Sequence, residues 1–459
     1  MTNNAEYTDE YLAEIARLGG DADGRRAARD YMEHSTAIYH HEVVDSAYVP
    51  RLYDKATRER MRHIAETTHS ALCKVMREYL DNPAYRDVYD LDERMRELVL
   101  LPRGYDALLP FSRFDIFLDE DTLGAGFCEF NADGSSGMNE DREISASIAN
   151  SVPFSAFAKK HSVRTSESEL FDGWVDEFLR VYATYEHRAE HPHVAIVDFL
   201  ENSVTDEFKV FAALFAKHGV ECSVYDMREL RFEGGRLMGG HAFFGRDDAP
   251  IDAVWRRCVT NDVADHWDES QALIEAVRAH AVALIGSFAG HLVHDKQVFR
   301  VLRDPRTRAL LSDEENALME ELVPTTAFLE DGAVDIAEVK ANREQWIIKP
   351  TDAYGAQDVF AGREFESDEE WARVVDAHAN GAAGAPFLAQ RYITPFKTLT
   401  LPLYGEEADY TRDAVPFNNL TGLYVYNGRF VGAFSRLGPN PVICKRTHGI
   451  TAASVWVED

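Results

Sequence analysis

The sequence has few cysteines and none of them are paired in a recognisable motif. The five cysteines are scattered along 459 residues, at Cys73, Cys128, Cys222, Cys258 and Cys444. Such a set argues against a disulfide framework and against a structural zinc site. The histidine groups at 187, 191 and 193 and at 291 and 294 also lack the cysteine or carboxylate spacing of a zinc site. We therefore expect reduced, mostly buried thiols.

Long apolar runs are also missing. No stretch approaches the roughly 20 apolar residues that a membrane-spanning helix needs. The first residues, Met1–Glu6, have neither a basic segment nor an apolar segment of the kind that marks a protein for export. These absences predict a cytoplasmic protein that does not bind membranes. The strand-like run at residues 193–198 is not followed by Gly-x-Gly-x-x-Gly, which removes the case for a dinucleotide-binding fold.

Positive charge is scarce. Lysine and arginine number 48 against 79 aspartates and glutamates, for a formal net charge of −31. This balance repels nucleic acid and anionic lipid. It is also typical of a salt-adapted or very soluble surface, and a few lysines and arginines in a cleft can still hold a nucleotide. We expect no nucleic-acid partner.

Helical and strand-like patterns alternate along the chain. Residues 5–100 are predicted to be helical, most clearly Arg58–Tyr79, where apolar residues recur every three or four positions. Residues 193–198, 208–218 and 221–225 are predicted to form a strand, a helix and a second strand, which is a βαβ unit of a small parallel sheet. A hairpin is predicted over residues 421–436, with Asn427-Gly428 as a type I′ turn.

A second hairpin is the first candidate for a functional site. Residues 113–120 and 126–133 alternate apolar and polar side chains. Asp115, Glu129 and Asn131 are therefore expected on one face, with Phe114, Phe117 and Phe130 pointing elsewhere. Two carboxylates and an amide suit Mg²⁺, and Arg113 beside them offers a fork of donors for oxyanions. The alternative is an ordinary hairpin with acidic residues facing water.

A loop rich in small residues follows this hairpin, at residues 133–140. Its glycines allow close backbone approach, and Ser135 and Ser136 could hold a substrate carboxylate or phosphate at the start of the next helix. It is not a nucleophile elbow, because Met138 stands where the second glycine of Gly-x-Ser-x-Gly is required. A plain turn is the alternative.

The last third of the chain carries a predicted nucleotide grip. Lys349 ends a buried strand and is followed by a glycine-containing loop with Tyr354 and Gly355, an arrangement suited to gripping the phosphates of a nucleotide. Residues 387–393 are predicted to form another strand, whose end at Gln390, Arg391 and Tyr392 is suited to bonding an adenine edge through backbone groups. Lys296 lies near the start of a predicted helix.

In this order, the pieces resemble glutathionylspermidine synthase and its relatives, a branch of the ATP-grasp superfamily with a circularly permuted core. The resemblance runs from about Tyr105 to the end, and its most specific block is Arg113-Phe-Asp115 followed by Glu129-Phe-Asn131-Ala-Asp133. The chain departs from the family in its Gly-Ser-Ser-Gly loop at 134–137. It also has helices in place of an amidase domain before the synthetase part.

The resemblance implies an α+β, ATP-grasp-type fold with a small parallel α/β subdomain and an N-terminal helical region. The implied units are residues 1–104 (helical region), 105–189 (first part of the core, with the metal-site hairpin), 190–265 (the βαβ subdomain) and 266–459 (lid and remainder of the core). It implies Mg²⁺ at Asp115, Glu129 and Asn131, with ATP phosphates at Lys296 and Lys349. Arg113 and Arg436 would act on the reacting phosphoryl group.

The implied activity is ATP- and Mg²⁺-dependent ligation of a carboxylate to an amine through an acyl phosphate, with release of ADP and phosphate. The expected partners are a small-molecule or peptide carboxylate and an amine. Two alternatives stay open. One is a non-catalytic ATP-grasp-like binding protein, and the other is an ATP-dependent phosphotransferase.

Overall fold

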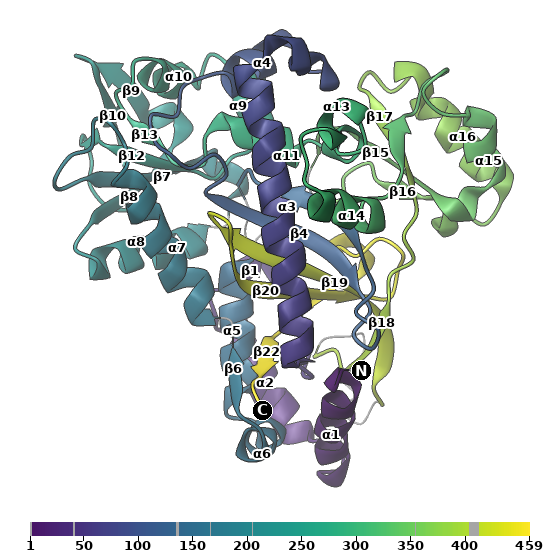
Figure 1. Ribbon diagram of the computed structural model, residues 1–459. Coiled ribbons are helices and arrows are strands. Elements are labelled where there is room, and N and C mark those ends of the chain that lie inside the picture. The colour runs from purple at the N-terminus through teal and green to yellow at the C-terminus, as the bar shows by residue number, and fades with distance from the viewer. Residues whose placement is uncertain are drawn as a thin grey trace.

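The computed structural model describes residues 2–39, 42–134, 137–165, 167–203, 205–353, 355–403 and 413–459, with the backbone alone for 39, 167–169 and 202. Helices and sheets are mixed along the whole chain, so the fold is of the α+β class. Figure 1 shows a central sheet crossed by one long helix, with smaller sheets to either side.

The central sheet carries the predicted metal-site hairpin. Its main strands run in the order β21-β20-β19-β4-β5, all antiparallel, and β18 pairs with β19. The strands are β4 (Phe111–Leu118), β5 (Ala125–Asn131), β18 (Lys397–Thr400), β19 (Val415–Tyr426), β20 (Arg429–Gly438) and β21 (Ile450–Ala452). The β19–β20 hairpin turns at Asn427 and Gly428, which have φ values of 44° and 87°. Positive φ at both positions is the signature of the predicted type I′ turn.

The long helix α3 (Lys55–Asp81) covers one face of this sheet. Its buried residues recur at the helical spacing seen in the sequence, among them Met61, Ile64, Leu72 and Val75. Asp54 caps the helix by accepting a hydrogen bond from the backbone of Thr57 at 2.8 Å. The predicted helix over residues 58–79 is therefore confirmed. The opposite face of the central sheet borders the cavity described below.

The parallel sheet has the strand order β13-β12-β7-β8. Its elements are β7 (His193–Asp198), α8 (Thr205–Lys217), β8 (Glu221–Asp226), β12 (Ala253–Arg256) and β13 (Ala283–Leu284). The predicted βαβ unit is confirmed as β7-α8-β8, with β7 and β8 parallel. One face packs on α7 (Glu167–Tyr182) and α8, and the other on α9 (Thr260–Asp265) and α10 (Gln271–Arg278). A small sheet of β9 (Leu230–Glu233), β10 (Arg236–Gly239) and β11 (Pro250–Ile251) follows β8.

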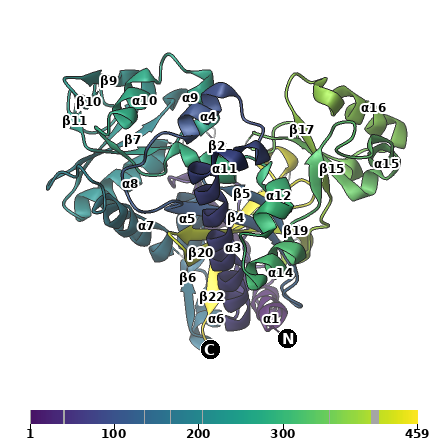
Figure 2. The same ribbon diagram turned by 45° about the horizontal axis from the view of Figure 1, so that its top comes forward.

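A third sheet holds the predicted nucleotide grip. It is antiparallel, in the order β14-β17-β15-β16. The strands are β14 (Thr326–Phe328), β15 (Trp346–Pro350), β16 (Phe360–Ala361) and β17 (Phe387–Arg391), covered by α15 (Ile336–Ala341) and α16 (Asp368–His378). This sheet and the parallel sheet lie on opposite sides of α3 and the central sheet in both ribbon views (Figures 1 and 2). Short helices α11 (His291–His294), α12 (Val298–Val301), α13 (Pro305–Arg308) and α14 (Asp313–Leu322) precede it.

The N-terminal region is less helical than the sequence predicts. Besides α1 (Asn4–Arg17), α2 (Ala22–Glu33) and α4 (Glu93–Val99), it contains β1 (Ile38–Tyr39), β2 (Glu42–Val43) and β3 (Arg51–Tyr53). Strand β3 pairs with β22 (Ser454–Val457), which also pairs with β6 (Val163–Thr165) between α6 (Val152–Lys160) and α7. A three-residue strand has too few residues to show a periodic pattern, so only its distant partner reveals it.

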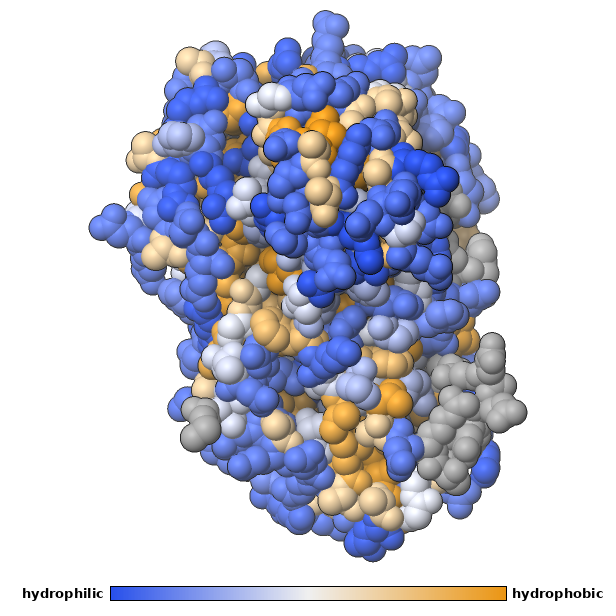
Figure 3. Space-filling model, turned by 90° about the vertical axis from the view of Figure 1, so that its right-hand side faces the viewer, coloured by the Kyte–Doolittle hydropathy of each residue, from blue (hydrophilic) through white to orange (hydrophobic). Residues whose placement is uncertain are grey.

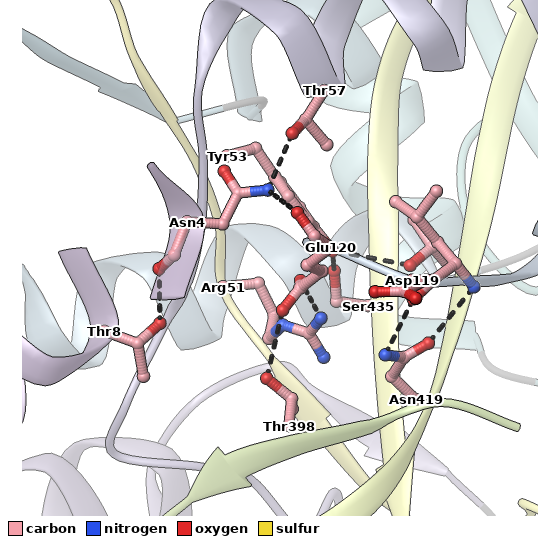
Figure 4. Close-up of polar contacts among 12 residues, drawn as sticks. Asn4, Thr8, Arg51, Tyr53, Thr57, Asp119, Glu120, Thr398, Asn419 and Ser435 are labelled. Atoms are coloured by element: carbon pink, nitrogen blue, oxygen red, sulfur yellow. Dashed lines mark hydrogen bonds and ion pairs between the residues drawn. The ribbon is translucent and has the colours of Figure 1, made fainter. Parts of the chain in front are cut away.

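Polar contacts fasten this region to the turn of the β4–β5 hairpin (Figure 4). Asn4 donates to the backbone carbonyl of Glu120 at 3.0 Å and to Thr57 at 2.6 Å. The Glu120 carboxylate accepts from Thr398 at 3.1 Å and forms an ion pair with Arg51, whose side chain is 3% exposed. Breaking a buried pair of this kind costs about 3–5 kcal/mol, because one charge is left without a partner. The turn of the β4–β5 hairpin is thus bonded to Asn4 of α1, Arg51 of β3 and Thr398 of β18.

One face of the molecule is mainly hydrophilic. On the face shown in Figure 3 hydrophilic residues predominate, and apolar residues form patches near its top, in its middle and in its lower part. The five cysteines are free thiols, two of them buried and three half-buried. No helix in the described ranges is both long and apolar enough to cross a bilayer.

Candidate functional site

The β4–β5 hairpin presents the predicted polar residues on one face. Arg113 pairs with Asn131 and Asp115 pairs with Glu129 across the two strands. Because side chains alternate along a strand, these four share a face. On the other face Phe114 and Phe130 meet edge to face with ring centroids 5.5 Å apart. The expected alternation is confirmed for these residues.

Phe117 was wrongly placed by the sequence prediction. It stands two residues after Asp115, so the period of two puts it on the same face, and it lines the cavity together with Arg113 and Glu129. A β-bulge opposite Ile116 shifts the register of β5. Past the bulge Phe127 turns into the core against Phe130, with ring centroids 4.7 Å apart, while Cys128 packs near Phe117.

Asp115 is fully buried beneath this face and is held by two arginines. Arg113 donates to its carboxylate from Nε at 2.7 Å and from Nη2 at 3.0 Å. Arg436, from β20, forms an ion pair with the same carboxylate, and Asn131 Nδ2 donates to it at 3.4 Å. Gly422 on the neighbouring strand β19 leaves room for this group, since a Cβ there would lie 2.7 Å from Arg113 Cδ. A side chain at that position would push the pair apart.

The two hairpin carboxylates differ in electrostatics. Burial raises the pKa of Asp115 above its usual value, with Arg113 and Arg436 opposing the rise. Burial also acts to raise the pKa of Glu129, but Arg436 and Lys296 outweigh it and hold that pKa well below its usual range. Glu129 lies 3.6 Å from Arg436 and its side chain is 31% exposed. It is the ionised carboxylate that faces the cavity, whereas Asp115 lies behind it.

One cavity of about 830 Å³ joins the residues that the sequence singled out in distant segments. This volume is within the usual range for a ligand site. Ten predicted site residues line it: Arg113, Glu129, Asn131, Lys296, Lys349, Gly355, Gln390, Arg391, Tyr392 and Arg436. Asp115 contributes no surface to it. The predicted residues Ser135, Ser136 and Tyr354 lie outside the described residues.

The two lysines reach the cavity from different elements. Lys349, on β15, donates to the backbone carbonyl of Cys128 at 3.3 Å and lies over the Phe299 ring, 4.7 Å from its centroid. Lys296, between α11 and α12, donates to the carbonyl of Ala353 at 2.5 Å, in the loop after β15. Burial lowers the pKa of Lys349 to about 8. Two cations on one wall attract an anionic group such as a phosphate chain.

Two backbone donors at the end of β17, where adenine recognition was predicted, are already engaged within the protein. The backbone N–H of Arg391 donates to Thr325 and that of Tyr392 to Gln345, each at 2.8 Å. The Gln390 side chain donates to Thr326 at 2.8 Å. These donors are used within the protein because β17 is a central strand with neighbours on both sides. Gln390, Arg391 and Tyr392 line the cavity. The backbone N–H groups of Arg391 and Tyr392 are already bonded, so they are not available as donors to an adenine edge.

Sequence reasoning missed several charged residues that line the cavity, among them Glu140 and Arg257. Glu140, in the first turn of α5 (Met138–Ala149), has a pKa that burial and the neighbouring Glu207 raise to about 7. Arg257, directly after β12, is 7% exposed. Glu140 is the last residue of the small-residue loop at 133–140, and Arg257 directly follows the apolar run that ends at Arg256. No sequence pattern indicated that the two segments would meet.

The donor set at the hairpin fits a hard divalent cation. Within the described ranges, no group of three or more histidine, cysteine, aspartate or glutamate side chains is placed to hold a metal ion. The hairpin instead offers the ionised Glu129 and the amide Asn131, with Asp115 behind. Two carboxylates and an amide suit Mg²⁺, which keeps several waters and takes other ligands from phosphates. Arg436 Nε is buried without a hydrogen-bond partner in the described structure.

Comparisons with known proteins support the fold. No family model matches the chain, and no curated protein matches it. The structure of a glutathione synthetase-like effector from Globodera pallida, solved in its apo form, superposes with a TM-score of 0.63 at 10% identity, covering 95% of this chain and 96% of that chain. A candidate gamma-glutamylcysteine synthetase from Methylobacillus flagellatus has a TM-score of 0.39 at 11% identity, covering 83% and 87%.

The first of these similarities establishes a shared fold over nearly the whole length, including the N-terminal region. The second TM-score is too low to support a shared fold. The fold is therefore that of a glutathione synthetase-like protein, and the narrower resemblance to glutathionylspermidine synthase stays a hypothesis.

Proposed function

We propose that the protein is an ATP- and Mg²⁺-dependent carboxylate–amine ligase that forms an amide bond and releases ADP and phosphate. The observation that carries the proposal is the single cavity in which Glu129, Asn131, Lys296, Lys349 and Arg436 meet from four separate segments of the chain. An acidic metal edge facing two lysines and an arginine is the combination that phosphoryl transfer requires. We also propose that the core is of the ATP-grasp type and that the chain is divided into the four units 1–104, 105–189, 190–265 and 266–459.

Each side chain has a role in that reaction. Lys296 and Lys349 would orient the nucleotide phosphates, and Arg436 would stabilise the oxyanions of the transferred phosphoryl group. Arg113 fixes Asp115 and with it the position of Arg436. Glu129 and Asn131 would hold Mg²⁺, with Asp115 behind them, and a bound Mg²⁺ neutralises charge on phosphates. Glycine-containing residues 351–358 would exclude water, which otherwise hydrolyses an acyl phosphate.

The substrates follow from the reaction class. They are a small-molecule or peptide carboxylate, activated by phosphorylation, and an amine that attacks it. No side-chain nucleophile is needed. The excess of acidic residues argues against nucleic acid and anionic membranes as partners, and the cytoplasmic location stays a prediction.

A second candidate is a non-catalytic protein that uses the same scaffold for binding. The observation that favours it is the engagement of the Asp115 carboxylate by both Arg113 and Arg436. A cation that used Asp115 as a ligand would have to displace an arginine. No single feature favours the third possibility, transfer of phosphate to a substrate without ligation.

Calorimetric titration with ATP in the presence and absence of Mg²⁺ separates the first two candidates. We expect ATP to bind and Mg²⁺ to strengthen the binding, because Glu129 faces the cavity as an anion. Absence of ATP binding under both conditions would favour the non-catalytic scaffold. A screen of carboxylates and amines then tests ligation by ADP release that requires both substrates, and a phosphorylated product without free phosphate would indicate phosphotransfer.

Nucleotide affinity is expected to fall as the pH rises through 8. Burial lowers the pKa of Lys349 to about 8, so this side chain is charged at pH 7 and mostly neutral at pH 9. Loss of the charge removes its attraction for phosphate, and we expect about tenfold weaker ATP binding at pH 9 than at pH 7. Calorimetry at both pH values measures the change.

The Lys349→Arg variant is the control for this pH profile, because arginine stays charged throughout the range. Its ATP affinity should change much less between pH 7 and pH 9. A wild-type profile that is flat over the same range would contradict a role for Lys349 in binding phosphate.

A further inference from the structure

Helix α11 carries two buried histidines and lies between the β4–β5 hairpin and the loop that follows β15. A Cβ at Gly290, directly before α11, would lie 2.6 Å from the backbone oxygen of Ala132, so the helix packs closely on the end of the hairpin. On the other side, the backbone N–H of Lys296 donates to the carbonyl of Thr351 at 2.8 Å. His294, the last residue of α11, lines the cavity between these two contacts.

The histidines face a carboxylate from this loop without forming a hydrogen bond to it. His294 Nε2 lies 3.8 Å from Asp352 Oδ1, and His291 Nδ1 lies 4.0 Å from Asp352 Oδ2. The His294 and His291 side chains are only 6% and 2% exposed. Within the described part of the chain, both ring nitrogens of His294, Nδ1 of His291 and Oδ2 of Asp352 lack a hydrogen-bond partner. Buried polar atoms left in this way cost free energy, and an imidazolium would draw the carboxylate to it as a charged donor.

The charge on His294 depends on groups from three elements. Burial lowers the pKa of His294 below its usual value and outweighs the Asp133 and Asp352 carboxylates, which favour the imidazolium. Lys296 and His291 act in the same direction as burial. The ring is therefore mostly neutral at neutral pH when the cavity holds no ligand.

A phosphate chain on Lys296 would change this balance. The Lys296 side chain lines the cavity and opposes a proton on His294. A polyanion bound to Lys296 offsets that repulsion and adds negative charge of its own, so it raises the pKa of His294. Asp262 on α9 and Asp295 place further negative charge near Asp352, which also favours a cation as the partner of that carboxylate.

We propose that His294 is a positioning residue of the nucleotide site, which takes up a proton from the solvent when a phosphate chain binds and then holds the Asp352 carboxylate. Asp352 lies between Thr351 and Ala353, whose carbonyls accept from the backbone and the side chain of Lys296 at 2.8 and 2.5 Å. The contact would therefore fix residues 351–353 beside Lys296. The inference deepens the proposed function and rests on it for the identity of the nucleotide.

The test is calorimetry of ATP binding to the full-length protein at pH 6.5 with saturating Mg²⁺, in buffers of different ionisation enthalpy. The dependence of the heat on the buffer gives the number of protons taken up. We expect the wild type to take up at least about 0.3 proton more per ATP than His294→Gln, which cannot be protonated. Lys349 is already charged at this pH, and Glu140 is common to both proteins, so neither contributes to the difference.

The pH profile of ATP affinity is an independent readout. A proton taken up on binding strengthens binding as the pH falls. Between pH 7.5 and pH 6.0 the wild type should gain about threefold more affinity for ATP than His294→Gln, the factor that about 0.3 proton gives over this range. A merely structural role for His294 would change the affinity by the same factor at both pH values.

Asp352→Asn tests the same contact from the loop. It removes the charge that holds the imidazolium, so it should also lose the extra proton uptake, and it serves as the second variant if His294→Gln does not fold. The matched control is His218→Asn. His218 Nδ1 lies 3.5 Å from Asp176 Oδ1 and its side chain is 32% exposed, so this variant should match the wild type in both measurements.

Equal proton uptake in the wild type, His294→Gln and Asp352→Asn, or parallel pH profiles, would overturn the proposal. Failure of the proposed function has a different signature, because the wild type would then not bind ATP. Inorganic triphosphate replaces ATP in that case. Binding of triphosphate with the same dependence on His294 would support the proposal and reject ATP as the ligand, whereas binding of neither compound would overturn both.

Discussion

Replacing Glu129 with alanine is expected to lower Mg²⁺-dependent ATP turnover by at least about 10³-fold, or about 4 kcal/mol of transition-state stabilisation. Glu129 is the hairpin carboxylate that both lines the cavity and stays ionised. Without it, Arg436 keeps its ion pair with Asp115, but Arg436 and Lys296 lose a neighbouring anion, and the metal edge keeps only an amide on the cavity surface. The measurement is ADP release at saturating ATP, with calorimetry of Mg²⁺ and ATP binding.

Two further variants make this result specific. Glu233→Ala removes an exposed glutamate on β9, where it pairs with Arg231, and should leave turnover unchanged. Asp115→Ala should also abolish turnover, but it leaves Arg113 buried without its carboxylate partner, so we expect it to lower stability as well. Retained turnover in both Glu129→Ala and Asp115→Ala would refute the metal and phosphate site.

Replacing Asp133 with alanine is expected to lower the free energy of unfolding by about 3–5 kcal/mol. Asp133 ends the Asn-Ala-Asp motif, yet its carboxylate forms an ion pair with Arg256, and the two side chains are 2% and 0% exposed. It also accepts a hydrogen bond from the backbone of Thr260 at 2.6 Å. Its removal leaves the Arg256 charge buried and unpaired. Urea denaturation followed by circular dichroism measures the loss.

The controls for Asp133 test the cause of that loss. Asp23→Ala removes an aspartate whose side chain is 96% exposed and paired with Arg26, and should change stability by less than about 0.5 kcal/mol. The double variant Asp133→Leu/Arg256→Met removes both charges and should be more stable than Asp133→Ala alone. A single variant as stable as the wild type would show that the pair does not tie the hairpin to β12.

Much of the local structure could be predicted because it depends on neighbours in the sequence. The spacing of apolar residues in α3 and the Asn427-Gly428 turn are short-range patterns, and both are confirmed. The β7-α8-β8 unit is confirmed for the same reason. The β3 strand was missed, because three residues show no period and its partner β22 lies about 400 residues away along the chain.

The site was predicted in part. The alternation rule placed Arg113, Asp115, Glu129 and Asn131 on one face, and the structure agrees. The same rule, applied correctly, would have put Phe117 beside Asp115. The bulge that turns Phe127 into the core has no signal in the sequence, because it depends on how β5 packs against its neighbours.

By itself the sequence determined which residue types stand at which spacing: the acidic hairpin, the lysine that ends β15 and the excess of negative charge. Only the tertiary structure decided that Asp115 lies behind the cavity between two arginines while Glu129 faces it. It also decided that Arg257 and Asp198 line the same cavity as Lys296 and Lys349. The reason is that burial and charge pairing depend on contacts between segments distant in sequence. These contacts set which carboxylate is ionised and which arginine has donors without hydrogen-bond partners.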